Sequence, residues 1–458
     1  MRGQTGLLSG LKAGHHGISL WIKLKIPLVD FPKLPILDFQ RQIRIQQYNF
    51  MSRRLFLFLL LCSYAGIAHS AIPQFFLPKT SLDAEDLAVI VNDNDPLSRR
   101  IGEYYQKRRN IPKQNLIHVR FRPGTTVMSQ SEFGRVKAEV DRKTPGSVQA
   151  FALTWAAPYR VDCMAITSAF AFGFNKAFCS HECGPTKSSP YYNSSSTAPY
   201  ANLKIRPTMA LAGLDFRSVK ALIDRGIAAD GSHPPGTAYL LSTSDRTRNV
   251  RAAAYPHLLQ EAANLVEVKL VESDFIRDKN DVLFYFTGSA NVPGLGTLRF
   301  RPGAIADHLT STGGQLTDSS QMSSLRWLEA GATGSYGTVE EPCNHLAKFP
   351  DPALVMYWYL AGNSLIEAYW KSVQWPGQGI FIGEPLAKPY GGFSVQMVNG
   401  EVVLRTQALP PGIYGLLGAN SVVGPYRPEP TSVAVHLGMN ELHFSNLDKT
   451  VYRLVRVR

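Results

Sequence analysis

The feature that most constrains the fold is an alternation of short apolar runs with segments of helical periodicity between residues 86 and 390. The run LAVIVND is followed by Asp95 and Pro96, which are typical of the cap and first turn of a helix. NLIHVRF and SVQAFALT are the next strand-like runs, and each is reached through a predicted helix. Strands that alternate with helices form a mostly parallel sheet with helices on both faces. We therefore predict an α/β domain over residues 86–390.

The alternation is interrupted once and ends before the C-terminus. Residues 158–207 combine a Ser/Tyr/Pro-rich stretch with no sustained periodicity, which predicts an irregular loop insertion of functional importance. Helices are then predicted over 215–227 and over 248–265, the second bent or interrupted at Pro256. Further strands are expected at VEVKLV, DVLFYF and GIFIG, and a further helix at SLIEAYWKSV. From residue 391 to 458, short apolar runs between Gly/Pro turns replace helical periodicity and predict a small C-terminal β domain.

Residues 51–70 have the parts of a signal peptide in order: two arginines, an apolar run over 55–61, and small residues before Ala71. The run is too short to span a bilayer. Because a signal peptide begins at its own initiator, we interpret Met51 as the true start of the protein. Residues 1–50 are then upstream sequence that was included because the gene was assigned a start codon too far upstream. The alternative is a genuine basic N-terminal extension. We expect export to the periplasm, cell surface or medium after cleavage near Ser70 and Ala71.

The net charge of +13 does not indicate a polyanion partner, because about half of it lies in residues 1–70. Nine of the 48 Lys/Arg and two of the 35 Asp/Glu lie in residues 1–70, which leaves 39 basic against 33 acidic residues in the remainder. Since no basic run with interleaved aromatic residues is present, a nucleic-acid partner is not expected. A membrane span in the mature protein is not expected either, because no run of about 18 apolar residues follows Ala71. The expected partner is a peptide, a protein or an envelope ligand.

Four cysteines follow the signal segment, and an even number in an exported chain favours disulfides. Cys163, Cys179, Cys183 and Cys343 allow three pairings, of which we favour Cys179 with Cys183, a pair close enough to close a tight loop, and Cys163 with Cys343. The alternative for CSHEC, with His181 between two cysteines, is a zinc site. Its spacing does not match a structural zinc motif, so no metal site is assigned.

Polar residues follow the predicted strands, and ligands of an open parallel sheet bind beyond the carboxyl ends of strands. Asp, Ser and Thr at such positions also cap helices, which is the commoner role. The candidate binding residues at strand ends are Asp93, Asp95, Asp245, Arg246, Thr287, Asn291, Tyr336, Glu340 and Glu341, with Trp155 as a neighbour.

Two catalytic arrangements are alternatives to simple binding. A cysteine hydrolase would use Cys343 as the nucleophile and His308, or His345, as the base, and it requires a free thiol. A metal-assisted hydrolase would need Asp93, Asp245 and Glu340 to converge with His308. No cofactor is expected, because the glycines of TGSANVPGLGTL fit neither phosphate-loop spacing and no P-loop lysine accompanies them.

Four long stretches carry a resemblance: VNDNDPLSRRIGEYYQKRRNIP, ADHLTSTGG, SSLRWLEAGATGSYGTVEEPCN and IEAYWKSVQWPGQGIFIGEPLA. Over about residues 86–390 the chain resembles an uncharacterised family of exported bacterial proteins that accompanies the exosortase sorting system. The resemblance implies export and a link to envelope protein sorting, but it supplies no catalytic residues.

More distantly, the order of elements resembles the caspase-like fold of gingipain-type cysteine peptidases. In those enzymes a His follows one core strand and the nucleophilic Cys follows the next. Here the first position holds Thr287 and Gly288, and the second holds Thr310 or Ser311. IFIGEP is similar to the segment that closes the gingipain-type domain. The resemblance therefore implies a degenerate relative, a pseudoenzyme, or a chain that uses another chemistry with His308 and Cys343 as displaced candidates. Our first hypothesis is a binding protein whose strand-end cleft lies beneath the loop of residues 158–207.

Overall fold

The computed structural model describes residues 72–457 except His181 and Ala263. The predicted upstream extension, the signal peptide and its cleavage site lie outside the described residues. Within the described part of the chain, no helix has the length and apolar character needed to cross a membrane.

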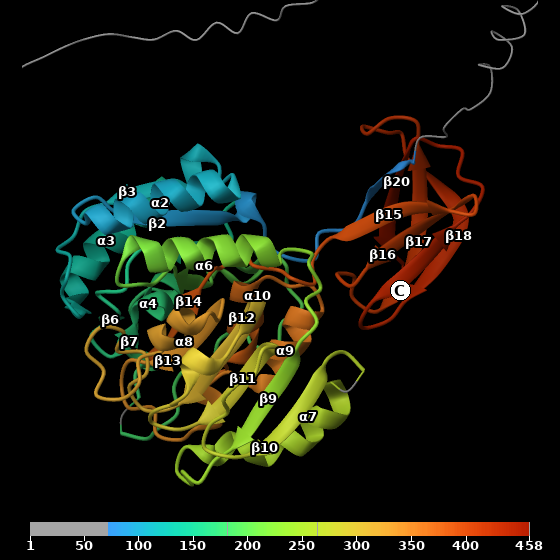
Figure 1. Ribbon diagram of the computed structural model, residues 1–458. Helices are drawn as coiled ribbons and strands as arrows, with labels where there is room; N and C mark the ends of the chain where they lie inside the picture. The colour runs from blue at the N-terminus through green and yellow to red at the C-terminus, as the bar shows by residue number, and fades with distance from the viewer. Residues whose placement is uncertain (1–71, 181, 263, 458) are drawn as a thin grey trace, which may run out of the picture. The chain divides into compact units, whose positions relative to one another are not determined.

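A ten-stranded sheet forms the centre of the α/β part (Figure 1). All its neighbouring strand pairs are parallel except β13 with β14, which is antiparallel. This confirms the predicted α/β fold with a mostly parallel sheet. The strand order is β10 (Glu267–Glu272), β9 (Thr237–Ser242), β11 (Val282–Gly288), β12 (Phe300–Leu309), β13 (Gly334–Thr338), β14 (Gly379–Gly383), β8 (Thr208–Ala210), β5 (Ala150–Leu153), β2 (Leu87–Asn92) and β3 (Leu116–Val119).

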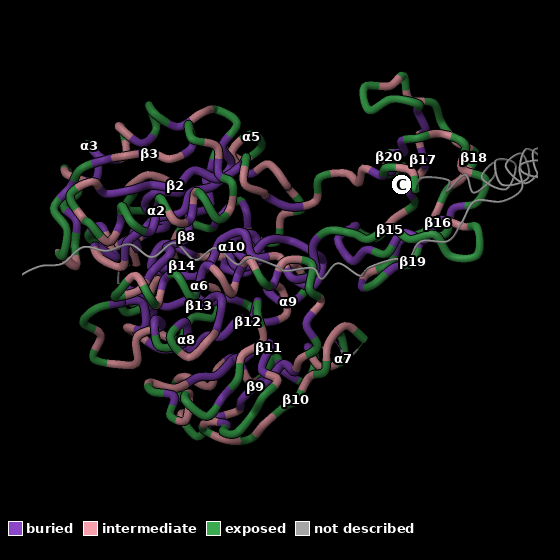
Figure 2. The backbone as a smooth tube through the Cα atoms, turned by 45° about the horizontal axis from the view of Figure 1, so that its top comes forward, coloured by how far each residue is buried: buried purple, intermediate pink, exposed green. Residues whose placement is uncertain are grey.

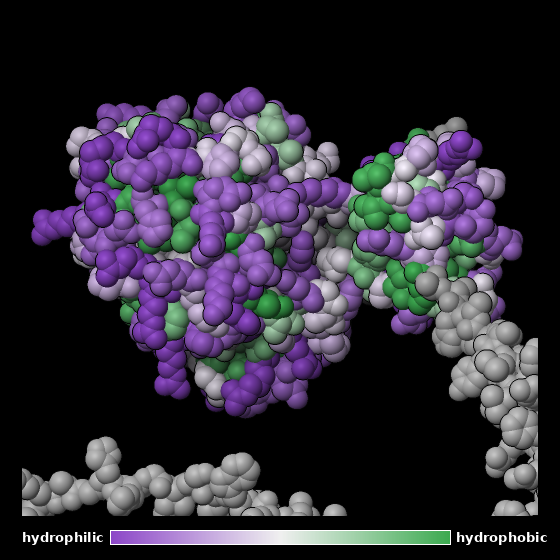
Figure 3. Space-filling view, turned by 90° about the horizontal axis from the view of Figure 1, so that it is seen from above, coloured by the Kyte–Doolittle hydropathy of each residue, from purple (hydrophilic) through white to green (hydrophobic). Residues whose placement is uncertain are grey.

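Helices cover both faces of this sheet because alternate residues of each strand point to opposite sides. Leu87, Val89 and Val91 of β2 pack in one core cluster with residues of α2 (Pro96–Arg109) and α6 (Phe216–Ala229). Ala88 and Ile90 pack in another cluster with residues of α3 (Gln130–Lys143) and α4 (Ile166–Phe172). The sheet strands lie mostly within the buried interior (Figure 2), and hydrophilic side chains dominate the face of the α/β part seen in Figure 3.

Helix caps account for several polar residues that follow strands. Asp95 accepts a hydrogen bond from the backbone N–H of Leu97, and Asp215 caps α6 in the same way through Ser218. The predicted helix over 248–265 is interrupted as expected: a 3₁₀ helix over Asn249–Ala254 precedes α7 (Tyr255–Ala262).

The insertion is more regular than its sequence predicts. It contains the short strands β6 (Arg160–Val161) and β7 (Met164–Ala165), then α4, and later α5 (Pro199–Leu203). The first six residues of α4 are buried, so the helix has no polar face and produces no amphipathic periodicity. The expectation of an irregular loop is therefore wrong for this part. Short β4 (Val127–Met128) pairs with β6.

Two helices flank the last core strands. α8 (Leu325–Ala330) and α10 (Leu365–Ser372) occur where SSLRWLEA and SLIEAYWKSV predict them. α9 (Pro352–Leu360) is not predicted, because its sequence PALVMYWYL is apolar on all sides.

The C-terminal residues form two small sheets, as predicted for a β region. One sheet contains β15 (Phe393–Val398), β16 (Glu401–Thr406) and β19 (Asn440–Phe444), all antiparallel. The other contains β17 (Gly412–Ala419), β18 (Arg427–Val435) and β20 (Val451–Arg456). Its fourth strand is β1 (Gln74–Phe76), which pairs in parallel with β20. The sequence does not predict that the start of the described chain belongs to this sheet.

A buried ionic network joins α2, α6 and the segment after β14. Glu384 is fully buried and accepts hydrogen bonds from Tyr105 and from the guanidinium of Arg109, which also pairs with Asp230. Removing one partner of a buried ion pair leaves the other charge uncompensated.

We therefore expect Glu384→Ala to lower the free energy of unfolding by about 3–5 kcal/mol. Glu261→Ala is the control, since the exposed His257–Glu261 pair should contribute within about 0.5 kcal/mol. Urea unfolding of both variants measures the difference, and equal midpoints would contradict the assigned role of the network.

Candidate functional site

The carboxyl ends of β9, β11, β12 and β13 lie side by side, because these strands are adjacent and parallel. Side-chain hydrogen bonds connect the four ends. Thr243 Oγ1 donates to the carbonyl of Gly288 at 2.6 Å, and Thr338 Oγ1 donates to the carbonyl of Thr310 at 3.0 Å. This edge is where open parallel sheets bind ligands.

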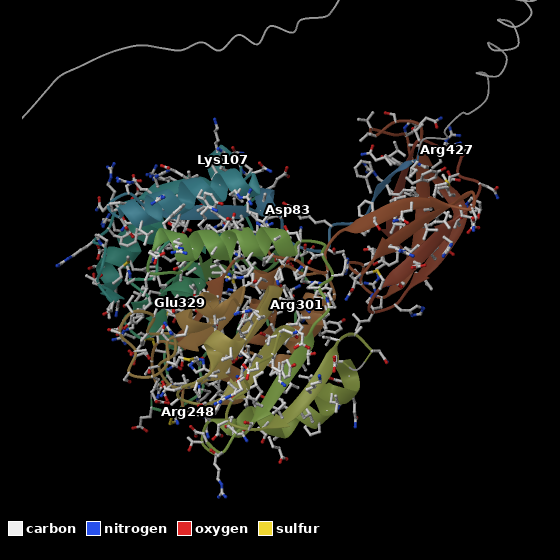
Figure 4. The ribbon with its side chains drawn as sticks, in the orientation of Figure 1. Asp83, Lys107, Arg248, Arg301, Glu329 and Arg427 are labelled. Carbon is white, nitrogen blue, oxygen red and sulfur yellow. A yellow bond between two sulfur atoms is a disulfide. The ribbon has the colours of Figure 1, made fainter. Side chains whose placement is uncertain are left out.

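Arg248 occupies the centre of this edge. Its Nε donates to Thr310 Oγ1 at 3.1 Å and its Nη1 to Asp245 at 2.8 Å, while a quarter of the side chain stays exposed. In Figure 4 Arg248 lies at the lower edge of the α/β part, and Arg301, near the start of β12, lies higher up in the sheet. Arg248 lines one of two cavities at this edge, and its partner Asp245 lines the other.

The first cavity, here called the acidic cavity, has a volume of about 600 Å³. Hydrogen bonds from the backbone N–H and hydroxyl of Ser244 hold the pKa of Asp274 below its usual range, so this carboxylate is ionised at neutral pH. Among the described residues that line the cavity, none is basic. They are Ser244, Asp245, Asp274, Phe275, Ser289, Asn291, Val292, Pro293 and Met322.

The second cavity, here called the disulfide cavity, is smaller, with a volume of about 160 Å³. Its lining mixes Arg248 with hydroxyl and amide groups, one carboxylate and the half-cystine Cys343. The residues are Thr247, Arg248, Leu309, Thr310, Ser311, Glu341, Pro342, Cys343, Asn344 and Phe349.

The disulfide pairing differs from the favoured one. Cys163 is bonded to Cys179, and Cys183 to Cys343, with Cα separations of 5.6 and 5.5 Å. Cys163 and Cys179 pack together against the core cluster, whereas Cys183 is exposed and reaches the loop after β13. Proximity along the chain is a poor guide here, because Cys183 pairs with a cysteine 160 residues away.

The residues proposed for a cysteine hydrolase do not form a catalytic pair. Cys343 is part of a disulfide, and both ring nitrogens of His308 have other partners. His308 Nδ1 accepts from Trp327 Nε1 at 2.9 Å, and Nε2 lies 3.0 Å from the carbonyl oxygen of Met322. His308 is buried and is not among the residues that line either cavity.

Close backbone packing fills the space beside Gly288 at the end of β11. A Cβ added to Gly288 would overlap the carbonyl group of Arg248 and lie 2.9 Å from the backbone nitrogen of Asn249. Real Cβ atoms do not approach main chain this closely, so the segment at Arg248 packs there only because residue 288 is glycine.

Gly288→Ala should therefore destabilise the protein by about 1–3 kcal/mol, since the backbone near Arg248 must shift. Gly296→Ala is the matched control, because nothing lies within 4 Å of a Cβ built there. Thermal unfolding compares the two variants, and equal melting temperatures would show that the packing is not tight.

The other predicted site residues divide into two groups. Asp245 and Asn291 line the acidic cavity, and Glu341 lines the disulfide cavity. Glu340 pairs with Arg160 of the insertion. Besides Glu340, the predicted residues outside both cavities are Asp93, Asp95, Trp155, Arg246, Thr287 and Tyr336. Asp93 pairs with His118 at 2.7 Å. Trp155, Thr287 and Tyr336 are buried.

The carboxylates proposed for a metal site do not converge. β2 and β9, which precede Asp93 and Asp245, are seven positions apart in the sheet, about 30 Å at the usual strand spacing. No group of three or more His, Cys, Asp or Glu suited to a metal occurs among the described residues. His181 lies outside them.

Sequence reasoning misses Arg248, Asp274 and Asn344 as lining residues. A signal exists for Asp274, which lies three residues after the run VEVKLV. Arg248 gives none, because its position depends on the contact with Gly288.

Comparison with known proteins identified no relative: no family model, no curated protein and no solved structure matches the chain.

The buried His308 makes stability depend on pH. Burial lowers the pKa of His308 to about 4, against about 6.5 for an unfolded chain. Because the unfolded state binds the proton first, this group's contribution is complete above pH 6.5 and is lost as the pH falls toward 4. The loss amounts to about 3 kcal/mol.

We expect the melting temperature to fall more steeply between pH 7 and 4.5 in the natural protein than in His308→Gln. Glutamine has an acceptor for Trp327 and a donor for Met322 but no titration in this range. Parallel pH profiles of the two proteins would contradict the buried neutral imidazole.

Proposed function

We propose that the protein binds an extended peptide segment at the carboxyl edge of β9, β11, β12 and β13 without cleaving it, and that a lysine or arginine side chain of the peptide enters the acidic cavity. The observation that carries the proposal is the lining of this cavity, which has two carboxylates and no basic side chain among its described residues.

The acidic cavity suits a long cationic side chain. Asp245 and Asp274 supply negative charge, and Ser244, Ser289 and Asn291 can accept hydrogen bonds from the charged head. Phe275, Val292, Pro293 and Met322 provide an apolar wall for the methylene stem. Arg248 partly offsets the charge of Asp245, but Asp274 is held by neutral Ser244.

The disulfide cavity suits the peptide backbone. Asn344, Ser311 and Thr247 carry amide and hydroxyl groups, and Arg248 can donate to a carbonyl oxygen. A small number of polar groups placed in a cavity fixes the orientation of its ligand.

Two observations support binding without cleavage. Thr310 is buried, donates to Gln321 at 2.7 Å and accepts from Arg248. The sulfur of Cys343 is in a disulfide and cannot attack a carbonyl. No observation favours the alternatives of a cysteine hydrolase or a metal-assisted hydrolase.

We also infer that the chain is a degenerate relative of the caspase-like peptidases, linked to envelope protein sorting. Two features support this inference. The two positions that would carry the catalytic residues lie at the carboxyl ends of the neighbouring strands β11 and β12: Thr287 and Gly288 end β11, and Thr310 follows β12. Two disulfides suit an exported protein.

The binding test uses residues 71–458 and fluorescein-labelled hexapeptides that differ only in a central lysine, arginine, norleucine or glutamate. We expect lysine and arginine peptides to bind at least ten-fold more tightly than the norleucine peptide in fluorescence anisotropy. Mass spectrometry should find every peptide intact after a day.

The double variant Asp245→Asn with Asp274→Asn should lose the preference for lysine, because it removes both carboxylates and keeps the side-chain shapes. Asp278→Asn is the matched control, since Asp278 follows the same strand as Asp274 but does not line the cavity. Equal binding of the lysine and norleucine peptides, or cleavage of either, would refute the proposed function.

A further inference from the structure

The two disulfides differ in their exposure to solvent. Cys163 and Cys179 are both partly buried and pack against the core cluster of the α/β part. Cys183 is exposed, and its partner Cys343 is half-buried in the wall of the disulfide cavity. External thiolates react at the sulfur they can reach, so Cys183 is the accessible target.

The backbone beside the exposed disulfide is strained. Cys343 has φ of 49° and Glu182, next to Cys183, has φ of 51°, in the left-handed region that non-glycine residues rarely adopt. Such conformations persist only when the surroundings hold them. The disulfide is one of the restraints that hold these two residues.

Among the described residues of the segment 180–187, few other contacts reach the rim of the disulfide cavity. Lys348 Nζ donates to Ser180 Oγ at 2.9 Å. The backbone N–H of Lys187 donates to the carbonyl of Ala177 at 2.8 Å. Beyond the segment the chain is anchored again at the buried Ser189, whose N–H donates to the carbonyl of Gln374 at 2.8 Å. Opening of the disulfide would therefore release a short segment and leave its flanks in place.

We propose that Cys183 is a site of thiol–disulfide exchange, and that exchange there releases the segment 180–187 from the rim of the disulfide cavity. The substrate class is an external thiolate. For its effect on peptide binding, and for nothing else, the inference rests on the proposed function.

The reaction balances as two exchange steps. The external thiolate attacks Cys183 Sγ and forms a mixed disulfide, while the bond to Cys343 breaks and its electron pair leaves on Cys343 Sγ, which takes a proton from water. A second external thiolate then attacks the mixed disulfide and frees Cys183. The two external thiols are oxidised to a disulfide, and Cys183 and Cys343 are reduced.

Differential alkylation of the oxidised protein, residues 71–458, tests the site. The protein is exposed to reduced glutathione, a monothiol, or to dithiothreitol, a dithiol, then quenched with iodoacetamide and analysed by mass spectrometry. We expect the Cys183–Cys343 disulfide to open at least ten-fold faster than the Cys163–Cys179 disulfide with both reagents. Glutathione should be trapped on Cys183 and not on Cys343. Equal rates for both disulfides, or adducts on Cys343, would overturn the proposal.

Hydrogen exchange tests the release. Reduction under conditions that spare the other disulfide should raise exchange in 180–187 and leave 189–193 unchanged. The variant Cys183→Ser with Cys343→Ser should reproduce this pattern, and Cys163→Ser with Cys179→Ser is the matched control. Because the natural protein is tested as well, a variant that fails to fold does not decide the result. Unchanged exchange after selective reduction would overturn the release.

Peptide binding separates the two proposals. Weaker binding of the lysine hexapeptide after selective reduction supports both. If the hexapeptide binds neither form while Cys183 reacts selectively and 180–187 is released, the exchange site stands and the proposed function fails. If binding is identical in both forms, the coupling between them is contradicted.

Discussion

A buried arginine holds together the edge of the sheet on which the candidate site is built. Arg251 is 3% exposed. Its guanidinium donates to Asp307 of β12 at 2.6 Å, to the carbonyl of Thr287 at the end of β11 at 2.7 Å, and more weakly to the carbonyl of Pro350 at 3.4 Å. Burial raises the pKa of Asp307, whereas the charge and hydrogen bond of Arg251 lower it. One side chain thus fixes two strand ends and the entry to α9, and loss of either charge would leave the other unpaired in the core.

The contacts of Arg251 also position the backbone of Arg248. Arg251 lies in the 3₁₀ helix that follows Arg248, so its hydrogen bond to the end of β11 holds the backbone of Arg248 against Gly288. Main chain therefore fills the space beside Gly288. The same contact sets Arg248 between the acidic cavity and the disulfide cavity, where its side chain can meet a ligand.

Much of the fold can be predicted from the sequence, because strands such as LAVIVN and helices capped by Asp95 or Asp215 carry local signals. Elements without polar faces, α4 and α9, give no periodicity and escape prediction. The site is predictable only in part. The sequence identifies three residues that follow strands and line the cavities: Asp245, Asn291 and Glu341. Asp93 follows β2, which is far from β9 in the sheet, and the order of strands in a sheet is not encoded in local sequence. The disulfide pairing fails for the same reason, since Cys183 and Cys343 are 160 residues apart.

We propose that this edge of the sheet holds a peptide through a cationic side chain and leaves it intact. The decisive measurement is a crystal structure of residues 71–458 with a bound lysine-containing hexapeptide. We expect an uncleaved peptide with its lysine Nζ between the carboxylates of Asp245 and Asp274 and its backbone beside Arg248. A peptide bound elsewhere on the chain, or a cleaved product at this edge, would refute the proposal.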